Sequence, residues 1–306
     1  MLIHVLGSAA GGGVPQWNCG CDNCRGVRNG SLPVRRRTQE CVAVSADGES
    51  WFLLNASPEI RQQIESFPAM WPRAPRHSPI AALVLTNGDL DHCLGLFSLR
   101  ESHPLKVYAT PSVRRGVTTG NVFYRTLERF EDQVTWTALE LSREVPLAGV
   151  GGEASGLAIT AIAAPGKLPL HLEGIAQPSA DDNVGLKIRD TKTGKVMVYF
   201  SGAAGPSPLL RAALGEADCV FFDGTFWSSD ELIGRGLGQR RAEDMAHWPV
   251  GGVDGSAAYL AGLRASRRVL IHLNNTNPAL VETSKERAHL TSLSIEVAYD
   301  GMEFSV

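Results

Sequence analysis

The sequence has no long apolar run: the longest, residues 80–85, is far shorter than the ~18 residues that a membrane span needs. It also has no strong excess of one charge, because 29 Lys and Arg stand against 32 Asp and Glu, a net charge of −3. This balance argues against a nucleic-acid-binding protein that depends on a basic surface. The first residues have neither the basic start nor the long apolar stretch of a signal peptide. A cytoplasmic protein without membrane insertion is therefore expected.

Cysteine is scarce and unevenly placed, with six residues in 306, which is too few for a disulfide scaffold of this size. Three of them, Cys19, Cys21 and Cys24, lie within six positions on a glycine-containing loop, so their sulfur atoms can converge. In a reducing cytosol such a cluster indicates a metal site, and a structural zinc needs a fourth ligand from elsewhere in the chain. Three free thiols, or a redox pair drawn from two of them, are the alternatives.

Short apolar stretches and helical stretches follow one another without an internal repeat or a low-complexity tract. Residues 41–46 and 51–54 flank Asp47 and Gly48, an arrangement typical of a β-hairpin. Residues 80–86 predict a buried strand, and residues 91–101 predict the helix that follows it. Strands followed by helices, with hairpins between them, predict one α/β domain over residues 1–306 in which helices cover the sheets.

The polar loop after the predicted buried strand leads into Asp91 and His92. Because α/β folds place their chemistry at the carboxyl ends of strands, this pair is a candidate for an active site. Taken alone, the pair is equally well explained as a helix N-cap beside a polar neighbour.

The segment resembles the signature loop of the metallo-β-lactamase superfamily, which is normally His-x-His-x-Asp-His after such a strand. Asn87 and Asp89 replace the first two histidines, whereas Asp91 and His92 are retained. Other landmarks appear in order: Ala203 stands where a bridging aspartate is usual, Phe222 and Asp223 resemble the next strand end, and His272 matches the last histidine. The resemblance implies that one metal site keeps two histidines and one carboxylate, the ligand set of non-haem Fe(II) oxygenases.

Longer blocks resemble the coenzyme PQQ biosynthesis protein B family; they are residues 6–19, 57–61, 222–226, 272–278 and 296–301. This resemblance implies the metallo-β-lactamase αβ/βα sandwich, with two mixed sheets flanked by helices, and a structural zinc. In related phosphodiesterases of the superfamily a late histidine completes the cysteine cluster. His247 in the present chain is therefore expected to join Cys19, Cys21 and Cys24.

The family is implicated in making pyrroloquinoline quinone (PQQ) from a crosslinked Glu-Tyr unit, and its members resemble iron-dependent hydroxylases of the tyrosine ring. By this resemblance Asp91, His92 and His272 hold Fe(II) and leave open positions for O2 as co-substrate. Zinc and manganese are the alternative metals. Asn274 and Asn275 are expected to orient ligands or contact substrate, unless they serve only the turn. Asp223 is expected to orient a ligand or a metal-bound water, and unassigned arginines to bind substrate carboxylates.

The expected substrate is a diamino acid derived from Glu and Tyr, and the resemblance leaves room for a homodimer. Two other functions are compatible with the same residues. One is a carrier that binds PQQ or an intermediate, in line with a role in transport of PQQ to the periplasm. The other is a zinc-dependent hydrolase on the same fold, although the missing histidines leave a two-metal site without half its ligands.

Overall fold

The computed structural model describes residues 1–306 and contains two sheets of seven strands each. The first sheet has the order β14-β1-β2-β3-β4-β5-β6, and the second has the order β13-β12-β11-β10-β9-β8-β7. The strands of the first sheet are β1 (Leu2–Gly7), β2 (Cys41–Ser45), β3 (Trp51–Leu54), β4 (Ile80–Val84), β5 (Leu105–Ala109), β6 (Val134–Ala138) and β14 (Glu303–Ser305). Those of the second are β7 (Glu144–Ala148), β8 (Ala154–Ala163), β9 (Val184–Asp190), β10 (Val196–Phe200), β11 (Cys219–Asp223), β12 (Arg267–Ile271) and β13 (Glu296–Val297).

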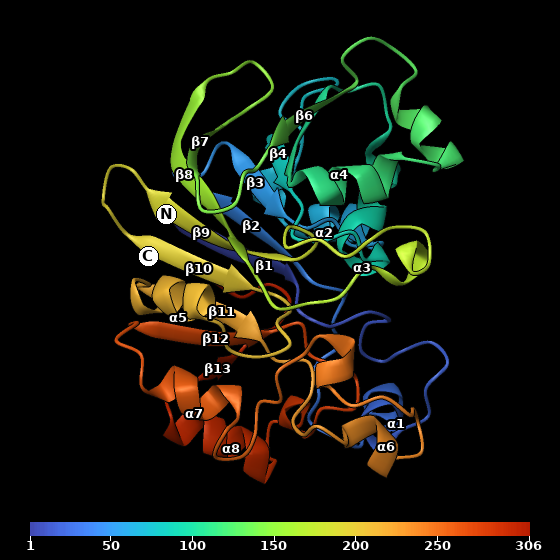
Figure 1. Ribbon diagram of the computed structural model, residues 1–306, viewed down its shortest axis with the longest axis vertical. Helices are drawn as coiled ribbons and strands as arrows, with labels where there is room; N and C mark the ends of the chain where they lie inside the picture. Colours follow the sequence, from blue (N-terminus) through green and yellow to red (C-terminus); the bar gives the residue numbers. More distant parts are fainter.

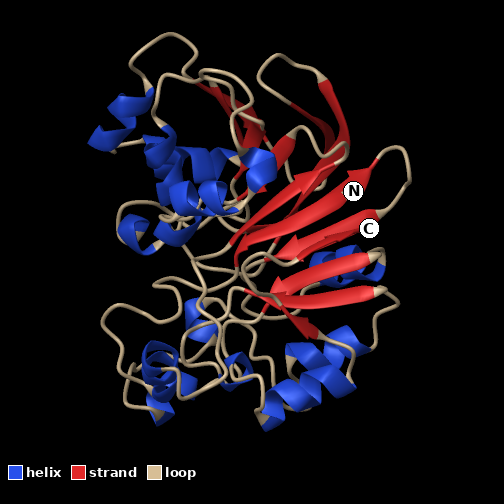
Figure 2. Cartoon of the chain, turned by 180° about the vertical axis from the view of Figure 1, so that it is seen from behind, coloured by secondary structure: helices blue, strands red, loops and turns tan.

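Helices cover the outer face of each sheet, and the inner faces pack against each other (Figures 1 and 2). The helices are α1 (Asp22–Asn29), α2 (Ile60–Ser66), α3 (Leu90–Cys93), α4 (Pro111–Thr118), α5 (Pro208–Gly215), α6 (Glu231–Gly234), α7 (Ser256–Ala261) and α8 (Lys285–Ser292). Short 3₁₀ turns lie at Pro68–Met70, Leu94–Leu99, Val122–Leu127, Leu170–Leu172, Glu243–Met245 and Pro278–Leu280.

Three apolar layers explain this arrangement. The central layer contains inward-facing residues of both sheets, such as Val44, Phe52 and Ile159. A second layer lies between the first sheet and α2 and α4, and a third lies between the second sheet and α5, α7 and α8. Strands buried on both faces are nearly continuously apolar, as in β4 and in β11 up to its last residue, Asp223. The predicted αβ/βα sandwich of two mixed sheets flanked by helices is confirmed. None of the helices is long and apolar enough to cross a bilayer.

The hairpin predicted from Asp47 and Gly48 forms between β2 and β3, which pair antiparallel. The helix predicted over residues 91–101 is wrong in length, because α3 ends at Cys93 and a 3₁₀ segment follows. The carbonyl of His92 accepts a hydrogen bond from the Ala56 N–H at 2.7 Å. This carbonyl thus accepts from outside the helix, whereas a continued α-helix would use it for the N–H four residues later.

Candidate metal centres

Asp91, His92 and His272 meet where strand ends from both sheets come together. Asp91 and His92 lie on α3 after β4, and His272 directly follows β12 of the other sheet. Asp91 Oδ2 lies 3.2 Å from His272 Nε2 and 3.7 Å from His92 Nε2, and the two imidazole centroids are 5.1 Å apart. One ligand atom from each residue lies within 4.8 Å of the others. These three side chains, called the histidine cluster below, therefore fit around a single cation.

Polar side chains at the ends of neighbouring strands orient His92. Its Nδ1 lies 3.1 Å from Asn55 Nδ2 and 3.2 Å from Thr86 Oγ1, while its Nε2 faces Asp91. The Thr86 hydroxyl and N–H both donate to Asn55 Oδ1 at 3.0 Å, which fixes the amide itself. Asn55 has a φ of 65°, a left-handed conformation that asparagine tolerates better than most residues. The imidazole is thus held with one nitrogen anchored and the other free for a ligand bond.

His272 is held in a similar way by a threonine and an aspartate. Thr225 Oγ1 donates to Asp223 Oδ1 at 2.6 Å and thus has its lone pairs free to accept from His272 Nδ1 at 2.7 Å. This arrangement places the proton on Nδ1 and leaves Nε2 to face Asp91. His272 has a φ of 60°, and such left-handed backbone at a non-glycine residue costs energy and concentrates at functional sites.

Charge and burial act in opposite directions on the ionisable groups of the cluster. Burial alone would raise the pKa of Asp91, but His92 and His272 hold that pKa well below its usual range. Burial lowers the pKa of His92, whereas in His272 the effect of burial is outweighed by Asp91, which raises the pKa. Glu40 lies behind them, with Oε2 4.0 Å from His92 Nε2, and burial raises its pKa to about 8. At neutral pH Asp91 is therefore the charged carboxylate that faces both imidazoles.

The structure places His247 beside the histidine cluster, which corrects the prediction that it joins the three cysteines. Its Nδ1 lies 2.8 Å from Asp223 Oδ2, and its ring stacks on His272 at 5.4 Å between centroids. Asp223 also accepts from the N–H groups of Ala203 (3.2 Å) and Thr225 (3.0 Å). This fully buried carboxylate is saturated by protein donors, so it orients His247 directly and His272 through Thr225.

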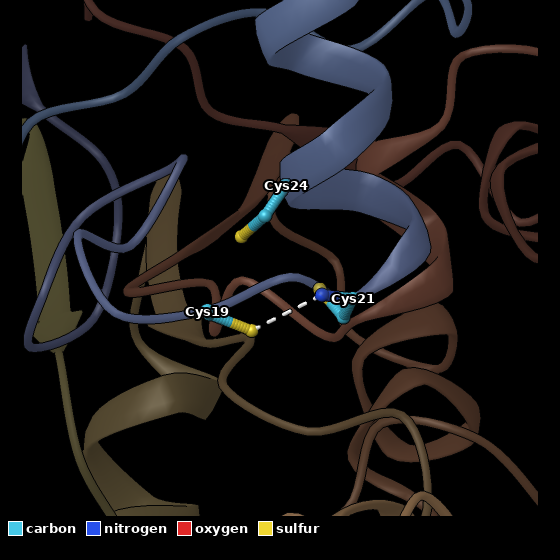
Figure 3. Close-up of side chains that lie close together, drawn as sticks. All are labelled: Cys19, Cys21 and Cys24. Carbon is cyan, nitrogen blue, oxygen red and sulfur yellow. Dashed lines mark hydrogen bonds between the residues drawn. The ribbon is translucent and has the colours of Figure 1, made fainter.

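Cys19, Cys21 and Cys24 lie at the start of α1, with their sulfur atoms within 4.8 Å of one another (Figure 3). Asn275, rather than a histidine, completes this group, which we call the cysteine cluster. Its Nδ2 lies 3.1, 3.5 and 3.3 Å from the sulfurs of Cys19, Cys21 and Cys24. The expectation that Asn275 serves the histidine cluster is thus corrected as well, because its side chain faces the thiols. Asn274 does line the cavity beside His272.

The donor set of the cysteine cluster fits a tetrahedral zinc. Sulfurs bonded at the usual ~2.3 Å lie ~3.8 Å from each other in such a site. A half-turn of the Asn275 amide exchanges its nitrogen for its oxygen, a ligand atom, at the same short distances from all three sulfurs. Burial raises the pKa of Cys19, but the Cys21 backbone N–H and neighbouring side chains outweigh burial and lower it. A lowered thiol pKa favours the thiolate form that binds metals.

A cavity of about 310 Å³ opens onto the histidine cluster. Besides His247 and Asn274 it is lined by side chains that the sequence analysis did not identify, notably Lys167, Asn183, Phe226 and Arg240. These residues come from loops that are distant in sequence, so no local motif could have identified them. Asn55 and Thr86 could have been noticed, because each is the first polar residue after a continuously apolar run, residues 51–54 and 80–85.

The chain is similar to one protein family in both sequence and structure. The model of the β-lactamase superfamily domain matches residues 50–273. A coenzyme PQQ synthesis protein B from Azotobacter vinelandii is 42% identical over 100% of both chains, and one from Methylorubrum extorquens is 44% identical over 99% of both. The crystal structure of Zn²⁺-bound PqqB from Methylobacterium extorquens superposes with a TM-score of 0.91, at 42% identity over 100% of both chains.

Proposed function

Because the chain belongs to the coenzyme PQQ synthesis protein B family of the β-lactamase superfamily, we propose that it acts in PQQ synthesis as an iron-dependent hydroxylase. Its substrate in this proposal is the crosslinked diamino acid derived from Glu and Tyr, and the reaction adds oxygen to the tyrosine ring. The observation that carries the proposal is the convergence of Asp91, His92 and His272 on one point. Two imidazoles and one carboxylate on one side of a cation leave its other positions open.

The residues of the histidine cluster fit a single Fe(II), which when bound would supply the activation of O2. Asp91 contributes the negative charge, and His92 and His272 contribute nitrogens that Asn55, Thr86 and Thr225 keep oriented. Asn87 lines the cavity but brings no imidazole, and its Oδ1 accepts from the Asp89 N–H at 2.9 Å. The chain thus lacks the histidine pair that a second metal of a hydrolase needs.

His247 gives the site a group that can move a proton. Asp223 holds its Nδ1 at 2.8 Å, so Nε2 is the nitrogen available to a phenol or ring proton of the substrate in the cavity. A buried carboxylate that holds one nitrogen of an imidazole in this way fixes which nitrogen faces the substrate. Hydroxylation of an aromatic ring replaces a ring C–H by C–OH, and that ring proton needs an acceptor.

A second metal, a structural zinc, belongs to the proposal. Cys19, Cys21 and Cys24 supply three thiolates, and Asn275 supplies the fourth ligand as its amide oxygen. Bound zinc would tie the segment before α1 to the loop after β12, and so hold together parts of the chain more than 250 residues apart. Metal binding by this cluster then contributes to folding rather than to the reaction.

The test is a single-turnover reaction. Protein loaded with Fe(II) is mixed with the Glu-Tyr diamino acid, ¹⁸O2 and a reductant, and the product mass is measured. Incorporation of ¹⁸O into a ring hydroxyl is expected. Substrate that binds without any oxygenated product would overturn the hydroxylase. Tight binding of PQQ with no turnover would then favour the carrier, and zinc-dependent hydrolysis of a phosphodiester or lactone would favour the hydrolase.

A further inference from the structure

Two cationic side chains reach the cavity above the histidine cluster from opposite loops. Lys167 lies on the segment between β8 and β9, and Arg240 lies on the segment between α6 and the turn at Glu243–Met245. Lys167 Nζ makes no hydrogen bond within the chain, and its nearest carboxylate oxygen, on Asp89, is 3.8 Å away. The Arg240 guanidinium has neither an ion pair nor a hydrogen bond, whereas that of its neighbour Arg241 pairs with Asp230 at 3.2 Å. The cavity therefore presents two incompletely partnered cations.

The loop that carries Lys167 is held in place. Its backbone carbonyl accepts from Asn183 Nδ2 at 2.6 Å, and Asn183 also lines the cavity. A Cβ at Gly166 would lie 2.5 Å from Asn183 Cγ, so only glycine permits this close approach. On the other side, the Ala242 N–H donates to the Ser229 carbonyl at 2.9 Å and anchors the chain two residues after Arg240. Both cations thus project from fixed backbone, which is what a binding site needs.

The charges of the cavity add up in favour of an anionic ligand. Its two acidic side chains, Asp89 and Asp91, balance one divalent cation at the histidine cluster. With that cation bound, Lys167 and Arg240 leave the cavity net positive, although Asp89 also faces Lys167 at 3.8 Å. A cavity with uncompensated positive charge and low-dielectric walls attracts anions, and an arginine guanidinium matches a carboxylate in two-point geometry. Leu170 and Phe226 add apolar surface suited to an aromatic ring.

We propose that Lys167 and Arg240 bind two carboxylates of the substrate, so that the site selects small aromatic compounds that carry at least two carboxylates. The volume of about 310 Å³ admits such a compound and excludes a folded partner. This inference rests on the proposed function for the identity of the substrate, but the recognition of carboxylates is tested separately from turnover.

The binding test uses PQQ, a tricarboxylate, and its neutral trimethyl ester as probes of the metal-loaded protein in calorimetric titrations. Loss of a charge-assisted hydrogen bond weakens binding by about tenfold or more, so Lys167→Gln and Arg240→Gln are each expected to raise the Kd for PQQ by that factor. Arg241→Gln is the matched control and should leave the Kd unchanged. The ester is expected to bind weakly and equally to all variants. Equal PQQ affinity in the wild type and in the variant that combines Lys167→Gln with Arg240→Gln would overturn the inference. The absence of PQQ binding by the wild type would overturn it as well.

Steady-state turnover of the Glu-Tyr diamino acid separates this inference from the proposed function. The two Gln variants are expected to raise KM by about tenfold with kcat nearly unchanged, because the cations bind substrate without touching the reacting ring. If wild type shows no hydroxylation while the charge-dependent binding of PQQ persists, the hydroxylase proposal fails and the carboxylate site stands. If turnover occurs and KM does not change in either variant, the carboxylate site fails and the hydroxylase stands.

Discussion

The cysteine cluster takes its three sulfurs from one short segment of the chain. The histidine cluster takes its ligands from distant segments, since Asp91 and His272 are 181 residues apart. The loop after β12 serves both, because His272 faces one cluster and Asn275, three residues later, faces the other. The three sulfurs require only a loop of suitable shape to converge, and tertiary structure adds Asn275. A distributed cluster requires the whole sandwich to be folded before its ligands meet.

The two clusters also differ in how firmly other side chains hold their ligands. Each imidazole of the histidine cluster is anchored at its second nitrogen by Asn55, Thr86 or Thr225, so its geometry exists without a cation. The hydrogen bonds of the Cys19 and Cys24 sulfurs lie only within the cluster and with Asn275. We therefore expect a metal to stabilise the fold at the cysteine cluster, and to occupy a prearranged site at the histidine cluster.

Removal of one thiolate is expected to have the largest effect on stability. Cys24→Ser should abolish zinc binding and lower Tm by on the order of 10 °C, because the binding free energy of a structural zinc is part of the folding free energy. Cys41→Ser is the control: this thiol is equally buried and donates to the Asn55 carbonyl at 3.3 Å, a bond that a hydroxyl can replace. Zinc content and calorimetric Tm are the measurements. Equal Tm in the two variants would contradict a structural zinc.

Removal of an imidazole is expected to leave the fold largely intact. His92→Ala should eliminate iron binding at the histidine cluster, and hydroxylation with it. The variant should still bind one zinc per chain, and its Tm should fall by only a few degrees. His4→Ala provides a control, since His4 is also buried but pairs with Glu303 at 2.9 Å, away from both clusters. Elemental analysis and Tm of both variants are compared. A fall in Tm as large as that of Cys24→Ser would contradict the division between a structural and a catalytic metal.

The sequence predicted the members of each cluster that lie close together in the chain better than their distant partners. The three cysteines and the Asp91–His92 pair are local patterns; the structure brings the three sulfurs together and places Asp91 and His92 beside His272. The fourth partner of the cysteines was predicted wrongly as His247, because nothing near His247 in the sequence indicates that Asp223 holds its ring. Asn275 lies next to Asn274, and the sequence treats the two alike, yet their side chains face different clusters. The choice depends on backbone direction after His272, which is set by tertiary contacts.

Truncation of Asn275 tests the fourth position of the cysteine cluster. Asn275→Ala is expected to lower zinc affinity by about 10–100-fold, and Asn275→Asp, which keeps an oxygen ligand, is expected to retain most of it. Asn274→Ala is the adjacent control. Competition with a chromophoric chelator gives the affinities. Unchanged affinity in Asn275→Ala would mean that the amide is not a zinc ligand and only contacts the sulfurs.

Glu40 allows the smallest effect to be measured, and it reports on the histidine cluster without removing a ligand. Burial raises the pKa of this carboxyl to about 8, while in the unfolded chain it is near 4.5. Between these values the folded state binds one proton more than the unfolded state, so the free energy of unfolding falls as pH rises, by about 1.4 kcal/mol per pH unit. Glu40→Gln should remove this slope between pH 5 and 8, which urea unfolding at several pH values can measure.

A cation held by Asp91, His92 and His272 would lower the pKa of Glu40, because the cation lies close to this carboxylate. Added Fe(II) or Mn(II) also competes with protons for His92 and His272, so it changes the slope of both proteins. The slope of the wild type should change by more than that of Glu40→Gln, because only the wild type also loses the Glu40 contribution. A slope in the wild type that is the same with and without the added metal would mean that no cation binds at this cluster, whatever the cysteine cluster holds.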